Sequence, residues 1–128
     1  MLEMLAPTVD VPAPVLWAAV CIALLVIEHV FSLATPPYGL HVPFFFHLVS
    51  SGLYSWLGVQ VWNGAGWASI VLTVLLGVQG VGRVFVWRAE DRAYAALVKT
   101  ILAAGQAVTA VTLALLWIPE SARQYLLG

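Results

Sequence analysis

The amino-acid sequence predicts an all-α membrane protein in which four transmembrane helices form an antiparallel bundle. Its 128 residues are 62% hydrophobic and only 9% charged, and the mean hydropathy is +0.99. So few charged residues do not cover a water-exposed surface. A hydrocarbon core of about 30 Å requires about 20 apolar helical residues per crossing. The chain therefore has room for four crossings with short connections, and residues 1–128 are expected to form one domain.

The first helix is predicted at about residues 14–33. Pro14 suits a first helical turn, because the amide that proline lacks has no partner within the helix at that position. Pro36 and Pro37 cannot continue the helix and so mark its end. The preceding segment carries two acidic residues but no Lys or Arg, whereas a secretory signal peptide needs a positive n-region. The first helix is therefore expected to be retained.

Three further helices are predicted at about residues 43–62, 65–87 and 93–118. Pro43 suits the start of the first of them, and the dipeptide Asn63-Gly64 provides the turn that follows it. Pro119 marks the end of the last one. The tail ESARQYLLG is expected to lie in the membrane interface as a short amphipathic segment.

The distribution of Lys and Arg predicts the orientation, because basic residues are retained on the cytoplasmic side. Arg88 and Arg92 place the connection between the third and fourth helices inside, so both termini face the non-cytoplasmic side. Arg123 in the outer tail runs against this assignment. Aromatic residues favour the headgroup level. The expected outer belt is Trp17, Trp62, Trp67 and Trp117, and the inner belt is Tyr38, Trp87 and Tyr94.

Five ionisable side chains are expected at one depth near the cytoplasmic side. They are Glu28, His29, His47, Arg83 and Lys99. A rise of about 1.5 Å per residue puts them within roughly 6 to 9 Å of the inner ends of their helices. Ionisable groups at this depth are costly unless they pair, line water or reach the interface. The sequence therefore predicts a polar layer in which Glu28 pairs with Arg83 or Lys99.

Small and polar residues recur at helical spacing on the predicted helices. Such residues let helix backbones approach where lipid removes the hydrophobic drive for association. The positions expected to mediate packing are Ser51, Gly58, Thr73, Gly77, Gly80 and Ala103. These faces fit either a tight bundle or a small protein packed against larger neighbours.

His29 and His47 are candidate cofactor ligands. Two histidines at matching depth on neighbouring helices are suited to bind both axial positions of a haem, or a chlorin magnesium each, with Arg83 and Lys99 facing acidic substituents. The alternative is that each imidazole is a hydrogen-bond partner for a serine or carboxylate, and serines lie within reach on both helices.

Glu28 supports a second alternative, because a membrane carboxylate that exchanges a proton is a device of proton-coupled carriers of small molecules. Four short helices leave little room for a pathway, so transport would need an oligomer. The competing interpretation is an ion pair that fixes the first helix against the third or fourth.

The leading hypothesis is a small integral membrane subunit, a scaffold or accessory component of a larger membrane complex or homo-oligomer. Its partners would be membrane lipid and other subunits or copies of itself. The net charge of −1 gives no basic footprint for nucleic acid. The single Cys21 excludes a cysteine zinc cage, and no catalytic motif is present, so an enzyme is disfavoured. Richness in Ala, Val, Leu and Gly with a single Lys indicates a bacterial inner (plasma) membrane.

Overall fold

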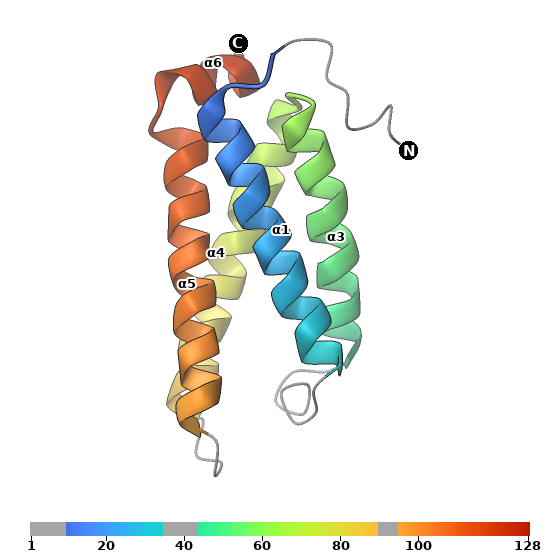
Figure 1. Cartoon of the computed structure of the whole chain (residues 1–128), viewed down its shortest axis with the longest axis vertical. Helices are drawn as coiled ribbons and strands as arrows, with labels where there is room; N and C mark the ends of the chain where they lie inside the picture. Colours follow the sequence, from blue (N-terminus) through green and yellow to red (C-terminus); the bar gives the residue numbers. More distant parts are fainter. Residues whose placement is uncertain (1–9, 35–43, 90–94) are drawn as a thin grey trace.

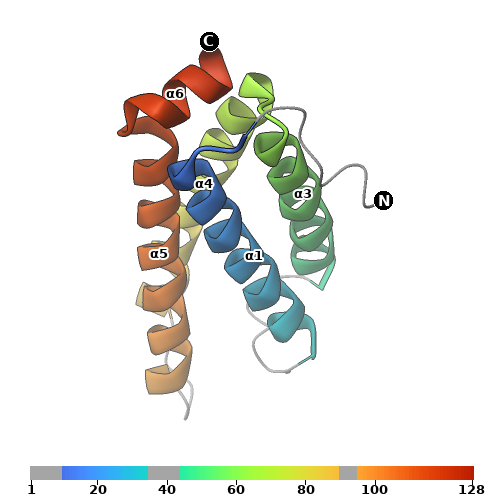
Figure 2. The same cartoon turned by 45° about the horizontal axis from the view of Figure 1, so that its top comes forward.

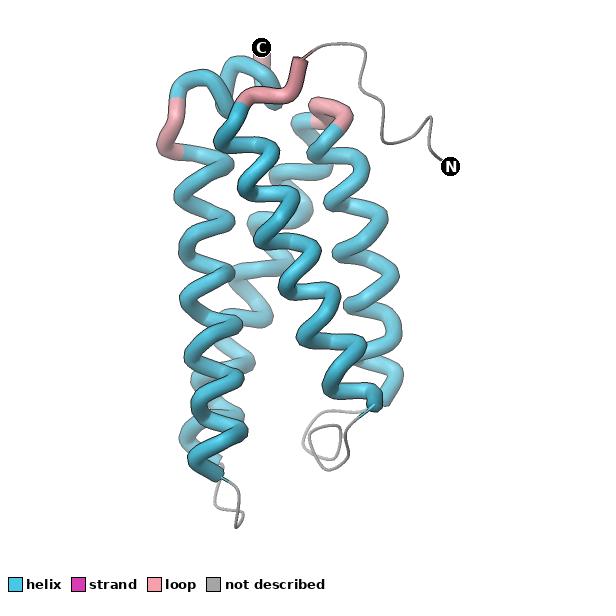
Figure 3. Tube along the Cα trace, in the orientation of Figure 1, coloured by secondary structure: helices cyan, strands magenta, loops and turns pink. Residues whose placement is uncertain are grey.

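A computed structural model of the chain describes residues 10–34, 44–89 and 95–128. These residues form five helices and contain no strand (Figures 1 and 3). The helices are α1 (Ala13–Ala34), α3 (Phe44–Trp62), α4 (Gly66–Ala89), α5 (Ala95–Trp117) and α6 (Glu120–Leu127). The all-helical class is confirmed, and each of the four long helices begins and ends close to the predicted bounds.

Three of these helices are long and apolar enough to cross a membrane: Ala13–Leu33, Gly66–Ala89 and Ala96–Trp117. The helix α3 is not among them, because its 19 residues include a histidine, three serines and a glutamine. Residues 35–43 and 90–94, which include most of two predicted connections and the predicted helix starts at 43 and 93, lie outside the described residues, as does Arg92.

The four long helices lie side by side, with α6 across one end (Figures 1 and 2). The helix α1 packs mainly against α3 and α5, and α4 also packs against α3 and α5. Buried apolar side chains fill the half of the bundle nearer α6. They are Val15, Ala18, Ile22, Leu25, Tyr54, Leu57, Val61, Ala68, Leu72, Leu76, Leu116, Ala122 and Leu126. Towards the opposite end, α1 and α3 diverge from α4 and α5.

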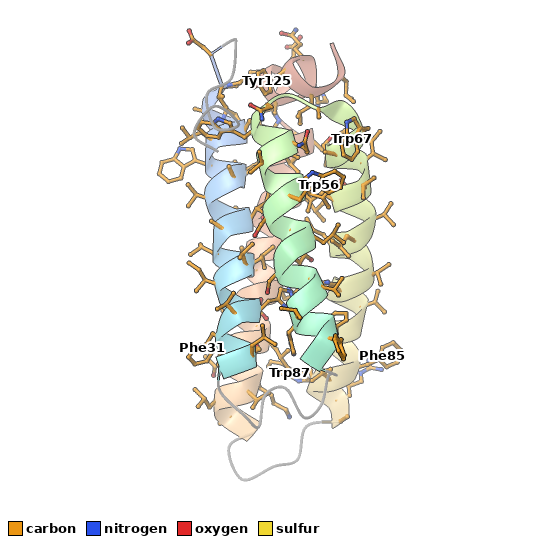
Figure 4. The ribbon with its side chains drawn as sticks, turned by 90° about the vertical axis from the view of Figure 1, so that its right-hand side faces the viewer. Phe31, Trp56, Trp67, Phe85, Trp87 and Tyr125 are labelled. Atoms are coloured by element: carbon orange, nitrogen blue, oxygen red, sulfur yellow. The ribbon has the colours of Figure 1, made fainter. Side chains whose placement is uncertain are left out.

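The outward surfaces of the long helices are apolar, as a lipid environment requires. Ile27 on α1, Val49 on α3, and Val74 and Phe85 on α4 each expose most of their surface. Figure 4 shows Trp56 and Trp67 towards the α6 end, and Phe31, Phe85 and Trp87 towards the other. Two members of the expected inner aromatic belt, Tyr38 and Tyr94, lie outside the described residues.

The short helix α6 closes one end of the bundle through polar contacts with helix termini. Arg123 donates hydrogen bonds to the carbonyl oxygens of Trp117 and Ile118, at 2.8 and 2.9 Å. A cation at a helix C-terminus satisfies carbonyls that lack intrahelical partners. The Tyr125 hydroxyl donates to the carbonyl of Trp62 at 2.6 Å, and burial raises the pKa of this phenol, which keeps its donating proton. These bonds give Arg123 a structural role in the tail, where a basic residue runs against the orientation predicted from the sequence.

Gly66 is the point where α4 meets the last turn of α6. A Cβ atom added here would overlap the backbone carbonyl oxygen of Leu126. We predict that Gly66→Ala lowers the free energy of unfolding by about 1–3 kcal/mol, since neither helix backbone can move without loss of packing. Thermal unfolding in mild detergent measures this change. Gly77→Ala is the matched control: no atom lies within 4 Å of its added Cβ, so equal effects at both positions would contradict the assignment.

Candidate functional site

An ion pair between the buried Arg83 and the partly buried Glu28 joins three helices in the half of the bundle away from α6. Arg83 on α4 lies 3.4 Å from a carboxylate oxygen of Glu28 on α1 and donates a hydrogen bond of 2.9 Å to the hydroxyl of Thr109 on α5. The Arg83 side chain is 8% exposed and that of Glu28 is 19% exposed. A salt bridge at this depth needs extra hydrogen bonds to offset desolvation of its charges. Thr109 supplies one of them.

Gly105 on α5 makes room for this ion pair. A Cβ atom at this position would lie 2.9 Å from Glu28 Oε2 and 3.0 Å from Arg83 Nε. The Thr109 hydroxyl in turn donates to the Gly105 carbonyl at 2.8 Å. The absence of a side chain at Gly105 therefore lets the backbone of α5 approach the two charges.

A second polar network joins α1, α3 and α4. The Nδ1 atoms of His29 and His47 share a hydrogen bond at 3.1 Å, and the Nε2 atom of His29 lies 3.3 Å from Gln79 Oε1. The Tyr54 hydroxyl donates to the same Gln79 oxygen at 2.5 Å, and the Gln79 amide nitrogen donates to the Ser50 hydroxyl at 3.1 Å. The Gln79 amide is thus the centre of the network.

The rings of this network also pack on one another. The imidazole of His29 stacks on the Tyr54 ring, with centroids 5.5 Å apart and planes 21° from parallel. Phe46 meets both imidazoles edge-on, at 6.0 Å from His29 and 5.6 Å from His47. Aromatic contacts of this kind fix the orientation of both imidazoles.

A cavity of about 260 Å³ adjoins both networks and is lined from all four long helices. Its polar lining residues are Glu28, His29, His47, Gln79 and Arg83. Its apolar lining comes from Phe46, Val78, Gly82, Val86 and Leu102. Charged and hydrogen-bonding groups from separate helices thus converge on one space within the bundle.

The positions of the two histidines do not favour the ligation of one haem iron by both. Two imidazole nitrogens that bind one metal ion from opposite sides stand about 4 Å apart, because each metal–nitrogen bond is about 2 Å long. The facing nitrogens here lie 3.1 Å apart, and the other nitrogen of His29 faces Gln79. As a separate observation, the described residues contain no group of three or more His, Cys, Asp or Glu side chains suited to hold a metal ion.

Lys99 occupies a different environment from the other predicted layer residues. Its ammonium group lies 5.4 Å from the centre of the Trp87 ring, a cation–π arrangement between α5 and α4. The structure therefore places Arg83, and not Lys99, beside Glu28. This pairing favours the structural interpretation of Glu28 over the carrier hypothesis, since proton exchange would first have to release the carboxylate from Arg83.

The six predicted packing residues divide into those in contact with other helices or turns of the chain and those on its outer surface. Four of them make contacts inside the chain. A Cβ at Gly58 would lie 3.0 Å from Ile22, Gly80 accepts a hydrogen bond from Gln106, Thr73 accepts one from Trp117, and Ser51 donates to the carbonyl of His47. The other two, Gly77 and Ala103, are exposed on the outer surface.

Thr109 and Gly105 were not predicted as members of the site. Their spacing of four residues puts them on one face of α5, and a small residue one turn from a hydroxyl residue is the available signal. That signal is weak, because the same helix carries several alanines at similar spacing. In the folded chain, the face of α5 that carries Gly105 and Thr109 differs from the other faces because it contacts Arg83.

We predict that the ion pair behaves as a coupled unit. Arg83→Gln leaves the Glu28 carboxylate without its partner, and removal of one member of a buried pair costs about 3–5 kcal/mol. The double variant Glu28→Gln/Arg83→Gln removes both charges and should be destabilised less than Arg83→Gln alone. Unfolding titrations in mixed detergent micelles measure these two variants together with the Glu28→Gln single variant. Additive losses would show that the two side chains do not interact.

The chain matches no protein-family model, and the curated proteins and solved structures compared with it likewise yield no match.

Proposed function

We propose that the chain is a small integral membrane subunit, a scaffold or accessory component of a larger membrane complex or homo-oligomer. In this proposal all four long helices cross the inner membrane of a bacterium. Both termini and the 62–66 turn lie on the non-cytoplasmic side, and the Arg88 end of α4 is cytoplasmic. Membrane lipid and other membrane-protein subunits, or copies of this chain, are its partners.

The surroundings of α3 support a crossing by this helix despite its lower hydropathy. It packs against α1 and α4, which are both long and apolar enough to span the membrane. Its polar side chains His47, Ser50 and Tyr54 are buried, whereas Phe45 and Val49 are exposed. The helix has 19 residues. At a rise of about 1.5 Å per residue, a helix of this size extends about 28 Å, close to the thickness of a hydrocarbon core.

The observation that carries the subunit proposal is an outer groove between α4 and α5, with a volume of about 530 Å³. Small side chains Ala103, Ala107 and Ala110 line its α5 side. In lipid, such small residues allow another helix to approach closely and gain dispersion contacts. On α4, Gly77 lies two turns from the groove residue Val84 on the same face and has no atom within 4 Å of an added Cβ. The alanine-lined side of this groove on α5 is therefore open to a neighbouring helix, beside the larger side chains Trp87 and Arg88 of α4.

The topology yields a direct test in a Cys21→Ala background, which removes the single native cysteine. Single cysteines at Val11, Asn63 and Ala89 report the ends of α1, α3 and α4. We expect a membrane-impermeant maleimide added to spheroplasts to label the first two, and to label the third only after permeabilisation. If α3 does not cross, the cysteines at positions 11 and 63 will react from opposite sides.

We expect Ala107→Leu to weaken association through the groove by about tenfold or more, because overpacking an interface costs about 1–3 kcal/mol. Native mass spectrometry after extraction in mild detergent measures the assembled fraction, with copies of itself or with copurifying subunits. Gly52→Leu is the matched control, since Gly52 is exposed on α3 with no atom within 4 Å of an added Cβ. A monomeric wild-type chain without copurifying protein would overturn the proposal.

A further inference from the structure

The short contact between Tyr54 and Gln79 fixes the orientation of the Gln79 amide. The two atoms are 2.5 Å apart. This separation suits an O–H···O hydrogen bond, because N–H···O bonds are longer, at about 2.7–3.2 Å. The amide oxygen of Gln79 therefore faces the Tyr54 hydroxyl. Because the same oxygen lies 3.3 Å from His29 Nε2, that nitrogen must carry a hydrogen and donate it.

This orientation determines the tautomers of both histidines in their neutral forms. A neutral imidazole has one N–H group and one nitrogen with a lone pair. Since His29 donates from Nε2, its Nδ1 atom accepts the hydrogen bond that joins it to His47. His47 therefore donates from Nδ1, and its Nε2 atom carries a lone pair.

The lone pair of His47 Nε2 has no hydrogen-bond partner among the described residues, although the nitrogen is buried. His47 is 8% exposed and lines the cavity. A buried acceptor without a donor loses its hydration without compensation, and such groups in native proteins call for an explanation. In the proposed membrane placement, the lipid around the bundle supplies no donor either. A bound molecule with a hydroxyl group would supply it.

The cavity also restricts what this molecule is. Benzene is known to occupy a protein cavity of about 150 Å³. The volume of about 260 Å³ found here admits one substituted aromatic ring but not a tetrapyrrole of four linked rings. Glu28 and Arg83 already neutralise each other, which favours a neutral head over an ion. Phe46 and Val78 line the cavity and are also exposed on the outer apolar surface, so a lipid-soluble tail has a route out between α3 and α4.

We infer that this cavity binds a neutral, lipid-soluble phenol or hydroquinone whose hydroxyl group donates a hydrogen bond to His47 Nε2. The ring lies against Phe46, and its hydrocarbon tail leaves between α3 and α4. The site rests on the proposed membrane placement of α3. It does not require the outer groove between α4 and α5 to be an interface, so the groove can fail as an interface while the site stands.

The test compares para-octylphenol with its methyl ether, which has a similar shape but no hydroxyl donor. Binding to the whole chain in nanodiscs is measured by the ligand-dependent rise in unfolding temperature. The phenol should bind about tenfold more tightly than the ether, the usual scale for one buried hydrogen bond. A hydroquinone of the same tail length distinguishes two kinds of natural ligand. If it binds more tightly than para-octylphenol, the ligand is a quinol lipid, and if the two bind equally, the ligand is a simple phenol.

Gly82→Leu tests the site without disturbing the fold, because Gly82 lines the cavity and no atom lies within 4 Å of its added Cβ. This variant should lose the preference for the phenol, whereas the control Gly52→Leu should keep it. Nitrogen NMR of histidine-labelled protein gives a readout without ligand, in which Nε2 is protonated in His29 and unprotonated in His47. Equal binding of phenol and ether, preference retained in Gly82→Leu, or the opposite tautomers would each overturn the inference.

Discussion

Hydrocarbon offers no hydrogen bonds, and this constraint governs the arrangement of the polar side chains in the bundle. Arg83 directs its guanidinium to a carboxylate on α1 and a hydroxyl on α5, while Gln79, one turn earlier, bonds to side chains on α1 and α3. Two residues four apart on α4 thus connect that helix to the other three. The polar groups satisfy one another inside the bundle, and the apolar side chains face outward.

The bundle therefore has two halves that are stabilised by different interactions. Near α6 the contacts between helices are mainly apolar and include several fully buried Leu and Val side chains. Towards the other end, an ion pair and hydrogen bonds replace them, and the cavity lies among these polar groups. Apolar packing tolerates small displacements, whereas a hydrogen bond weakens steeply with distance and angle. Hydrogen bonds consequently restrict the relative positions of the helices more closely in the polar half than apolar packing does in the other half.

The helices could be predicted closely from the sequence because prolines and a turn at Asn63-Gly64 mark several of their ends. Such residues act through local backbone sterics, which do not depend on the rest of the fold. The gathering of Glu28, His29, His47 and Arg83 also follows from depth alone, since antiparallel helices of similar length bring equal depths together.

Which side chains pair with one another within the site could not be predicted from the sequence, because the pairing depends on how each helix is rotated about its axis. In the folded chain α5 turns Gly105 towards Glu28 and leaves Lys99 against Trp87. The role of Gln79 is similar: an uncharged amide is ordinary in a sequence and becomes central only when side chains from two other helices surround it.

The contacts of α6 have a consequence for the order of assembly. This helix follows the other four in the chain, yet Tyr125 and Leu126 contact the turn between α3 and α4, which is synthesised much earlier. Chains fold from the N-terminus as they are made. The α3–α4 hairpin therefore exists before the residues that cover its turn have left the ribosome. Closure of this turn by α6 is then a later step of biogenesis than the formation of the α3–α4 hairpin.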